Sequence, residues 1–200
     1  MRKATKVYWK LCKRILFMAI AIIAISLFFI SCGEENDGTN EDGGEKTEDK
    51  TPIELLPRDN DISGWTRDWT FSEATNYAAL YDLIDGAAQN FIDNGFVSAV
   101  FQNYRNESGL QLELRIYEMN SEEDARKVYY ELAPASSIPW IDIIDTGRID
   151  NSALAAYSIE FQYKNFFVQD IIYERSDSSL EIARLFASHV IDLMKIGSNE

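Results

Sequence analysis

The sequence predicts an α+β fold in which an antiparallel sheet packs against helices. Residues 110–117 and 153–163 alternate apolar with polar side chains, which is the period of a strand with one buried face. Residues 76–96 instead place apolar side chains three and four positions apart, as an amphipathic helix does. The order strand, strand, helix occurs twice, at residues 97–132 and 153–195, and this repetition would also fit a duplicated unit.

Residues 1–31 have the pattern of a lipoprotein signal peptide. Six basic residues and no acid accompany an apolar run at residues 15–30. Residues 29–33 (FISCG) resemble a bacterial lipobox, and this resemblance implies cleavage before Cys32 and acylation of its thiol and new amino group. An uncleaved transmembrane anchor is the alternative, because the apolar run is slightly longer than the roughly 7–15 residues typical of a cleaved signal.

Residues 32–50 are expected to form an acidic, disordered tether. Residues 33–50 contain eight acids, two lysines and no aliphatic or aromatic side chain, so they have nothing to bury. Glu34 and Glu35 resemble an acidic label that directs some lipoproteins to the cell surface. Cys12 would leave with the signal peptide and Cys32 would carry lipid, so we predict no disulfide framework.

The charge of the chain argues against two classes of partner. The formal net charge is −14, and removal of the six basic residues within residues 1–31 changes it to −20. We therefore expect no binding to nucleic acid and no electrostatic attraction to anionic lipid. The predicted link to the membrane is the lipid on Cys32.

Residues 51–197 are predicted to form a single α+β domain, because their number is close to the commonest domain length. Near its start, residues 59–64 (DNDISG) match the first half of a calcium-binding loop. The twelfth position of such a loop would fall on Thr70 instead of a glutamate. An ordinary Asx-type turn is therefore preferred, with a calcium site as the alternative.

Residues 76–96 are predicted to form one helix that ends at Gly95. Its expected buried stripe is Tyr77, Tyr81, Ile84, Ala88 and Phe91, and its expected polar face is Asp82, Asp85, Gln89 and Asp93. A glycine inside a helix costs about 1 kcal/mol relative to alanine. We therefore expect Gly86, Ala87 and Ala88 to form a flat contact between helix and sheet, so that a larger side chain at Gly86 would destabilise the fold.

The rest of the domain is expected to alternate strands and helices. Strands are predicted at residues 97–104, 110–119, 140–144, 153–163 and 166–174, with a final helix at residues 180–195. Another helix should begin at Ser121 as N-cap and stop before Pro134. The acids Glu122, Glu123 and Asp124 would then lie at the positive end of the helix dipole. A metal site built from these three acids is the alternative.

Several segments carry a resemblance to a known family. They are residues 55–57 with 64–65, residues 81–88 (YDLIDGAA) running to 95–96, residues 116–119 with 123–125, and residues 166–168. Together they resemble the DUF6599 family of uncharacterised bacterial envelope proteins over nearly the whole domain, with residues 84–88 (IDGAA) as the most specific part. The chain departs from that pattern at Asn165, where the family often has glycine. The resemblance implies no activity.

The sequence lacks the common signatures of catalysis, such as a nucleophile elbow or a phosphate-binding glycine loop. His189 is the single histidine, and we expect it to be a core or edge residue because one histidine does not supply the usual zinc ligand set. Asp82 and Asp85 are weak carboxylate candidates, since three residues apart on a helix they could serve as the acid and base of a hydrolase. Solvated surface acids are the more usual case.

We expect a lipid-anchored protein of the bacterial cell envelope at the outer membrane, on its periplasmic or surface side, with a non-enzymatic binding or accessory domain. An envelope protein or a glycan is the expected kind of partner, and neither a cofactor nor a metal is expected. Two alternatives are a carboxylate-dependent hydrolase acting on envelope sugars or peptides, and a structural subunit of an envelope complex. A deep pocket with two facing carboxylates would favour the enzyme, and an exposed apolar patch of several hundred Å² would favour a protein partner.

Overall fold

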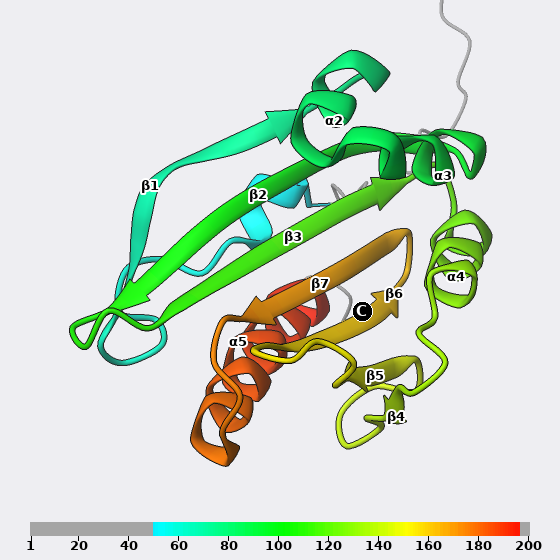
Figure 1. Ribbon diagram of the computed structural model, residues 1–200. Coiled ribbons are helices and arrows are strands. Elements are labelled where there is room, and N and C mark those ends of the chain that lie inside the picture. Colours follow the sequence, from blue (N-terminus) through cyan, green and yellow to red (C-terminus); the bar gives the residue numbers. More distant parts are fainter. Residues whose placement is uncertain (1–49, 197–200) are drawn as a thin grey trace, which may run out of the picture. The chain divides into compact units, whose positions relative to one another are not determined.

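The computed structural model describes residues 50–196 (Figure 1). The predictions for the signal peptide, for Cys32 and for the tether up to residue 49 lie outside the described residues, as do residues 197–200. Within residues 50–196, no helix is both long enough and apolar enough to cross a membrane.

A sheet of seven strands, antiparallel throughout, forms the centre of the described part of the chain and confirms the α+β prediction (Figure 1). The strands are β1 (Trp65–Ala74), β2 (Phe96–Asn106), β3 (Gln111–Met119), β4 (Ile138–Pro139), β5 (Gly147–Asp150), β6 (Tyr157–Tyr163) and β7 (Phe166–Ile172). Their order across the sheet is β1-β2-β3-β7-β6-β5-β4. Two hairpins, β2-β3 and β6-β7, therefore meet at the central β3-β7 pair, where Ile116 lies opposite Val168.

Helices cover both faces of the sheet. They are the 3₁₀ helix η1 (Pro52–Leu55), α2 (Tyr77–Ile84), the 3₁₀ helix η2 (Asp85–Ala87), α3 (Ala88–Asp93), α4 (Glu122–Glu131) and α5 (Asp177–Lys195). One face packs against η1 and α5, and the other packs against α2, α3 and α4. Because neighbouring residues of a strand point to opposite faces, Ile116 belongs to the first core and Tyr117 to the second.

Aromatic side chains fill both cores. On the α5 face, Phe186 packs edge-on against Trp65 and Tyr104, with ring centroids 5.4 and 4.9 Å away. On the α3 face, Phe91 stacks on Tyr117 at 4.1 Å. Such pairs add to the stability that comes from buried apolar area, so the domain has a substantial core on each side of the sheet.

The predicted cap of α4 is confirmed. The hydroxyl of Ser121 accepts a hydrogen bond from the backbone N–H of Asp124 at 3.1 Å, and this helix ends at Glu131, ahead of Pro134. Asn76 caps α2 in the same way, and Ser176 caps α5. These short polar side chains satisfy backbone donors that have no partner inside the helix, which fixes where each helix begins.

The helix predicted at residues 76–96 is instead broken at Asp85, whose φ of 52° and ψ of −138° leave the helical region. The break lies beside Gly86, where continuation of an α-helix is weakest. It also changes the buried stripe. Tyr77 and Tyr81 are exposed, and Leu80 is the buried residue of α2.

The break also corrects the expected contact between helix and sheet. Ala88 is fully buried, as that contact requires, but Gly86 and Ala87 are exposed. A Cβ added to Gly86 would meet no atom within 4 Å. Gly86 and Ala87 therefore do not form the flat contact, and a side chain at Gly86 would extend into open space.

The two strand-strand-helix units are present, yet they are not arranged alike. A two-fold rotation that exchanges the antiparallel neighbours β3 and β7 must run perpendicular to the sheet, so it would keep both helices on the same face. Instead α4 packs on one face and α5 on the other. The repeated pattern in the sequence therefore does not extend to a symmetric arrangement in space.

Both edge strands of the sheet are irregular. Strand β4 has only two residues, of which the second is Pro139. Strand β1 contains a bulge between Asp68 and Ser72, in which Trp69 has a φ of 67° and is 81% exposed. The buried amide of Gln102 donates to the carbonyl oxygens of Asp68 and Trp69 at 3.3 and 3.2 Å. This amide holds the bulge in place, and such bulges interrupt the pairing edge of a strand.

Candidate functional site

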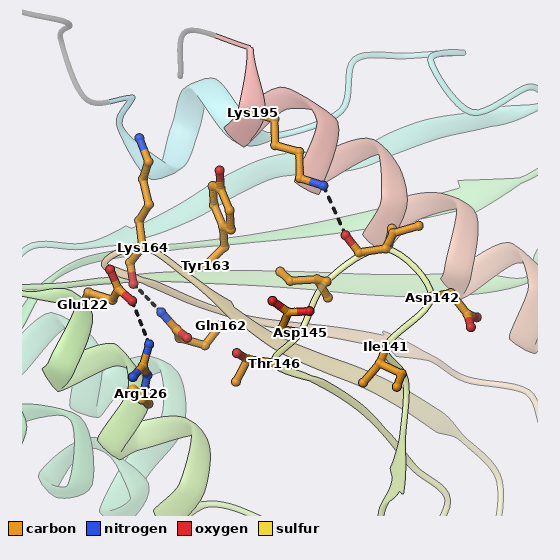
Figure 2. Close-up of a pocket in the computed structure, with 12 residues that line it drawn as sticks. Glu122, Arg126, Ile141, Asp142, Asp145, Thr146, Gln162, Tyr163, Lys164 and Lys195 are labelled. Carbon is orange, nitrogen blue, oxygen red and sulfur yellow. Dashed lines mark hydrogen bonds and ion pairs between the residues drawn. The ribbon is translucent and has the colours of Figure 1, made fainter. Parts of the chain in front are cut away.

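Two cavities lie on either side of the loop of residues 141–146 between β4 and β5. The larger cavity, of about 540 Å³, is bounded by α4, this loop, the β6-β7 hairpin and the end of α5 (Figure 2). The smaller cavity, of about 250 Å³, lies between the end of α4 and the start of β5. Ile141, Asp145 and Thr146 line both cavities, so the loop forms their common wall.

A close approach of two backbone segments fixes the base of this loop. The N–H of Trp140 donates to the carbonyl of Gly147 at 2.9 Å, and a Cβ on Gly147 would clash with the carbonyl oxygen of Trp140. Only glycine allows this approach. Trp140 and Ile144 are buried and hold the loop against the core, while Ile141, Asp142 and Ile143 between them are exposed.

Three exposed apolar side chains line the two cavities. They are Tyr130 (63% exposed), Ile141 (65%) and Ile143 (37%), here called the isoleucine surface. At roughly 200 Å² for a whole large side chain, these fractions amount to roughly 300 Å². The largest apolar patch on a typical monomer is about 300–600 Å², and such patches are often functional.

The larger cavity contains charged side chains of both signs. Arg126 is paired with Glu122 at 2.8 Å, and Nζ of Lys195 donates to the carbonyl of Ile143 at 3.1 Å (Figure 2). The side chains of Asp142 and Asp145 have neither an ion pair nor a hydrogen bond with any other residue in the range 50–196. Figure 2 shows that these two carboxylates do not point toward each other.

A buried ion pair lies under the smaller cavity. Arg148 donates from Nε to Oε2 of Glu160 at 2.7 Å, and Gln169 donates to Oε1 of Glu160 at 2.8 Å. The Arg148 guanidinium lies over the ring of Tyr129 at 4.1 Å and donates to the Tyr129 carbonyl at the end of α4. Arg148 therefore ties α4 to the sheet. Because Glu160 neutralises it, the base of the cavity offers no net charge to a ligand.

The carboxylates singled out in the sequence lie elsewhere. Asp82 and Asp85 are exposed and line neither cavity. Asp85 forms a hydrogen bond with the phenol of Tyr81, which raises the pKa of Tyr81. This arrangement gives no support to Asp82 and Asp85 as the acid and base of a hydrolase.

The other sequence candidates have local structural partners. Asp59 accepts from the backbone N–H of Arg67 and Asp61 from that of Arg58, each at 2.8 Å. Neither contact is the bond to the residue two positions on that defines an Asx turn. His189 is half-buried, with Nε2 3.4 Å from the Asp61 carboxylate. Among the described residues no group of three His, Cys, Asp or Glu side chains is placed to hold a metal ion. The acids at the start of α4 follow its N-cap.

No family model, curated protein or solved structure matches the chain. The resemblance to the DUF6599 family stays a prediction. Arguments about function therefore rest on the chemistry of the site itself.

The isoleucine surface was missed in the sequence because residues 140–144 were predicted to be a strand. Only Ile138 and Pro139 are paired with β5, and the loop begins after Trp140. The segment has an aspartate beside each pair of apolar residues, as in Ile143-Ile144-Asp145. A fully buried strand would not place unpaired acids there, so these acids are the signal that could have predicted an exposed loop.

Proposed function

We propose that the protein is a lipid-anchored component of the bacterial cell envelope whose domain binds another protein without catalysing a reaction. The observation that carries this proposal is the isoleucine surface, with roughly 300 Å² of exposed apolar side chains around two cavities. Burial of these side chains against a partner would remove apolar area from water. A binding role needs nothing more from the chain than this surface.

Sequence features support the proposed location. The basic start, the apolar run and the lipobox-like residues 29–33 are typical of a lipoprotein whose Cys32 carries the lipid. The resemblance to the DUF6599 envelope proteins points to the same compartment. We place the protein at the outer membrane, on the periplasmic or the surface side.

The geometry gives less support to a hydrolase. Asp142 and Asp145 line the larger cavity but do not face each other in Figure 2. Hydrolysis by two carboxylates needs both groups aimed at one bond. A structural subunit of an envelope complex would use the same isoleucine surface, and the experiment below covers that alternative as well.

Site-specific photocrosslinking in intact cells tests the proposal. Benzoylphenylalanine in place of Ile141 should give one discrete adduct with another protein. The same group in place of Leu185 should give none, because Leu185 is an isolated exposed side chain on α5 (54% exposed) outside both cavities. Adding Tyr130→Ser and Ile143→Ser should abolish the adduct from position 141. The proposal fails if position 141 gives no discrete adduct, or if positions 141 and 185 give the same one.

A further inference from the structure

Charges of both signs line the larger cavity in equal number. Three acids, Glu122, Asp142 and Asp145, are matched by three bases, Arg126, Lys164 and Lys195. Glu122 pairs with Arg126, and Lys195 keeps its charge although its ammonium donates to a backbone carbonyl. The side chains of Asp145 and Lys164 form no ion pair with any other of residues 50–196. The cavity therefore has no net charge, but it contains separate charges of opposite sign that a ligand could pair.

A fixed hydrogen-bond acceptor lies at the base of this cavity. The backbone N–H of Gln162 donates to the carbonyl of Thr146 at 3.0 Å, and its Nε2 donates to the carbonyl of Lys164 at 2.6 Å. Because a carbonyl only accepts, the amide nitrogen must face it and Oε1 must point away from it. Gln162 is 3% exposed and lines the cavity, and its Oε1 has no hydrogen-bond partner within residues 50–196. A ligand that donates a hydrogen bond would satisfy this oxygen.

Opposite charges flank this acceptor. Lys164 follows Gln162 by two residues in the turn between β6 and β7, and Asp145 directly precedes Thr146. In the view of Figure 2, Gln162 lies between Lys164 and Asp145. The volume of about 540 Å³ is within the range of roughly 300–1,000 Å³ that is typical of small-molecule sites. The cavity thus offers an acceptor at its base, an anion on one side and a cation on the other.

We propose that the larger cavity binds a small zwitterion, an amino acid or a short peptide with free termini. The ammonium group of the ligand donates to Oε1 of Gln162 and faces Asp145, and its carboxylate faces Lys164. A ligand with one charge would leave the opposite charge of the cavity without a partner, and a neutral sugar would leave both. This inference does not rest on the proposed function, because it uses the polar base of the cavity and not the isoleucine surface.

Four alanine dipeptides that differ only at their termini test the inference on the full-length protein in uncharged nanodiscs, with empty discs as background. The first has free termini, the second is N-acetylated, the third is C-amidated and the fourth carries both blocks. Glucose is the neutral comparison. Isothermal titration calorimetry should show the tightest binding for the free dipeptide. Each single block should weaken binding about threefold to fivefold, as the loss of one exposed ion pair does, and the double block should weaken it most.

Two variants assign the charges of the ligand to their partners. In Asp145→Asn the free and the N-acetylated dipeptides should differ by less than about twofold, because acetylation then removes a charge that has lost its partner. In Lys164→Gln the free and the C-amidated dipeptides should converge for the same reason. Glu107→Gln and Lys127→Gln remove the same charges from exposed positions outside the cavity, and both should keep the wild-type pattern.

The outcomes that would contradict the inference are distinct from those that bear on the proposed function. No binding of the free dipeptide above empty discs would overturn the inference, and so would equal binding of the free and the doubly blocked dipeptides. The wild-type pattern in both cavity variants would overturn it as well. Tighter binding of glucose would overturn it and assign the cavity to a sugar. The crosslinked adduct from position 141 is measured without dipeptide, so it tests the proposed function in each of these cases.

Discussion

Replacing Asp170 with asparagine should stabilise the protein at neutral pH, and the gain should grow with pH. Asp170 lies on β7 opposite Leu114 and Ile159, and its side chain is fully buried. Neither carboxylate oxygen has a hydrogen-bond partner among the described residues. Burial raises the pKa of Asp170 well above its usual range, and the nearby backbone of Ala187 lowers it by less.

The direction of the effect follows from this raised pKa. In the unfolded chain an aspartate loses its proton near pH 3.9, whereas the folded protein holds the proton of Asp170 to higher pH. The contribution of Asp170 to the free energy of unfolding should therefore be most favourable at low pH. It should fall by about 1.4 kcal/mol for each pH unit above about 4, until the pH passes the folded-state pKa.

Urea denaturation at a series of pH values measures this slope. Asp170→Asn has the same shape and cannot ionise, so near pH 4 its free energy of unfolding should lie within about 1 kcal/mol of that of the wild type. Above pH 4 the variant should become more stable than the wild type by about 1.4 kcal/mol for each further pH unit. The comparison uses the difference in free energy of unfolding between the two proteins, because Glu113 is present in both and its ionisation changes stability in the opposite direction. Burial raises the pKa of Glu113, but hydrogen bonds from Arg115 and Tyr173 outweigh burial and lower it.

Asp82→Asn serves as the control, because Asp82 is exposed on α2. This variant should keep the pH profile of the wild type. A constant difference between wild type and Asp170→Asn across the pH range would refute the reasoning, since it would mean that Asp170 has the same pKa in the folded and unfolded chain. A variant that becomes less stable as the pH rises would refute it as well.

Four further substitutions test the anchor and the fold. Cys32→Ala should release the protein from the membrane fraction, and metabolic lipid labelling that persists in the variant would reject the lipobox assignment. Asp85→Gly should raise the free energy of unfolding by about 1 kcal/mol in urea melts, because its φ of 52° suits glycine; an unchanged midpoint would mean that the backbone there is not strained. Gly86→Ala should raise it by about 0.5–1 kcal/mol, since the new methyl group meets no neighbour, whereas a loss would restore the contact expected from the sequence. Arg148→Met should lower it by about 3–5 kcal/mol because Glu160 is left buried and unpaired, and adding Glu160→Leu should recover most of the loss; no recovery would assign the effect to packing.

The regular parts of the fold could be predicted because their signals are local. The alternation from Leu110 to Tyr117 matches β3, whose Leu112, Leu114 and Ile116 are fully buried. Ser121 caps α4 as its position before three acids indicates. Each of these features depends on neighbours within a few residues, so the sequence contains the whole signal.

The break at Asp85 could not be predicted in this way. Apolar residues continue at spacings of three and four across it, from Tyr81 through Ile84 to Ala88, so the periodicity indicates one helix. Which of these residues are buried depends on the packing of two short helices against β1 and β2. Leu80 is buried while Tyr77 and Tyr81 are exposed. This packing, and not the spacing of the apolar residues, decides which side chains of α2 face the sheet.

The candidate site was missed for a similar reason. Ile141 and Ile143 occur in an apolar segment that resembles a strand, and their exposure follows from the contact between Trp140 and Gly147. That contact joins residues across a loop, and a single glycine in the sequence does not reveal its partner. The charges of the larger cavity come from α4, the loop of residues 141–146, the β6-β7 hairpin and α5, so only the fold brings them together.

The irregular edges of the sheet limit how this domain can be recognised. Many binding domains accept a strand from their partner, and main-chain hydrogen bonds then supply much of the affinity. Here β4 is two residues long and the bulge at Trp69 interrupts β1, so neither edge within residues 50–196 offers a long straight template. Copies of the domain at high local concentration would consequently not join into fibres through these edges. Recognition is left to side chains, and a few surface substitutions could redirect the same backbone from one partner to another as lineages diverge.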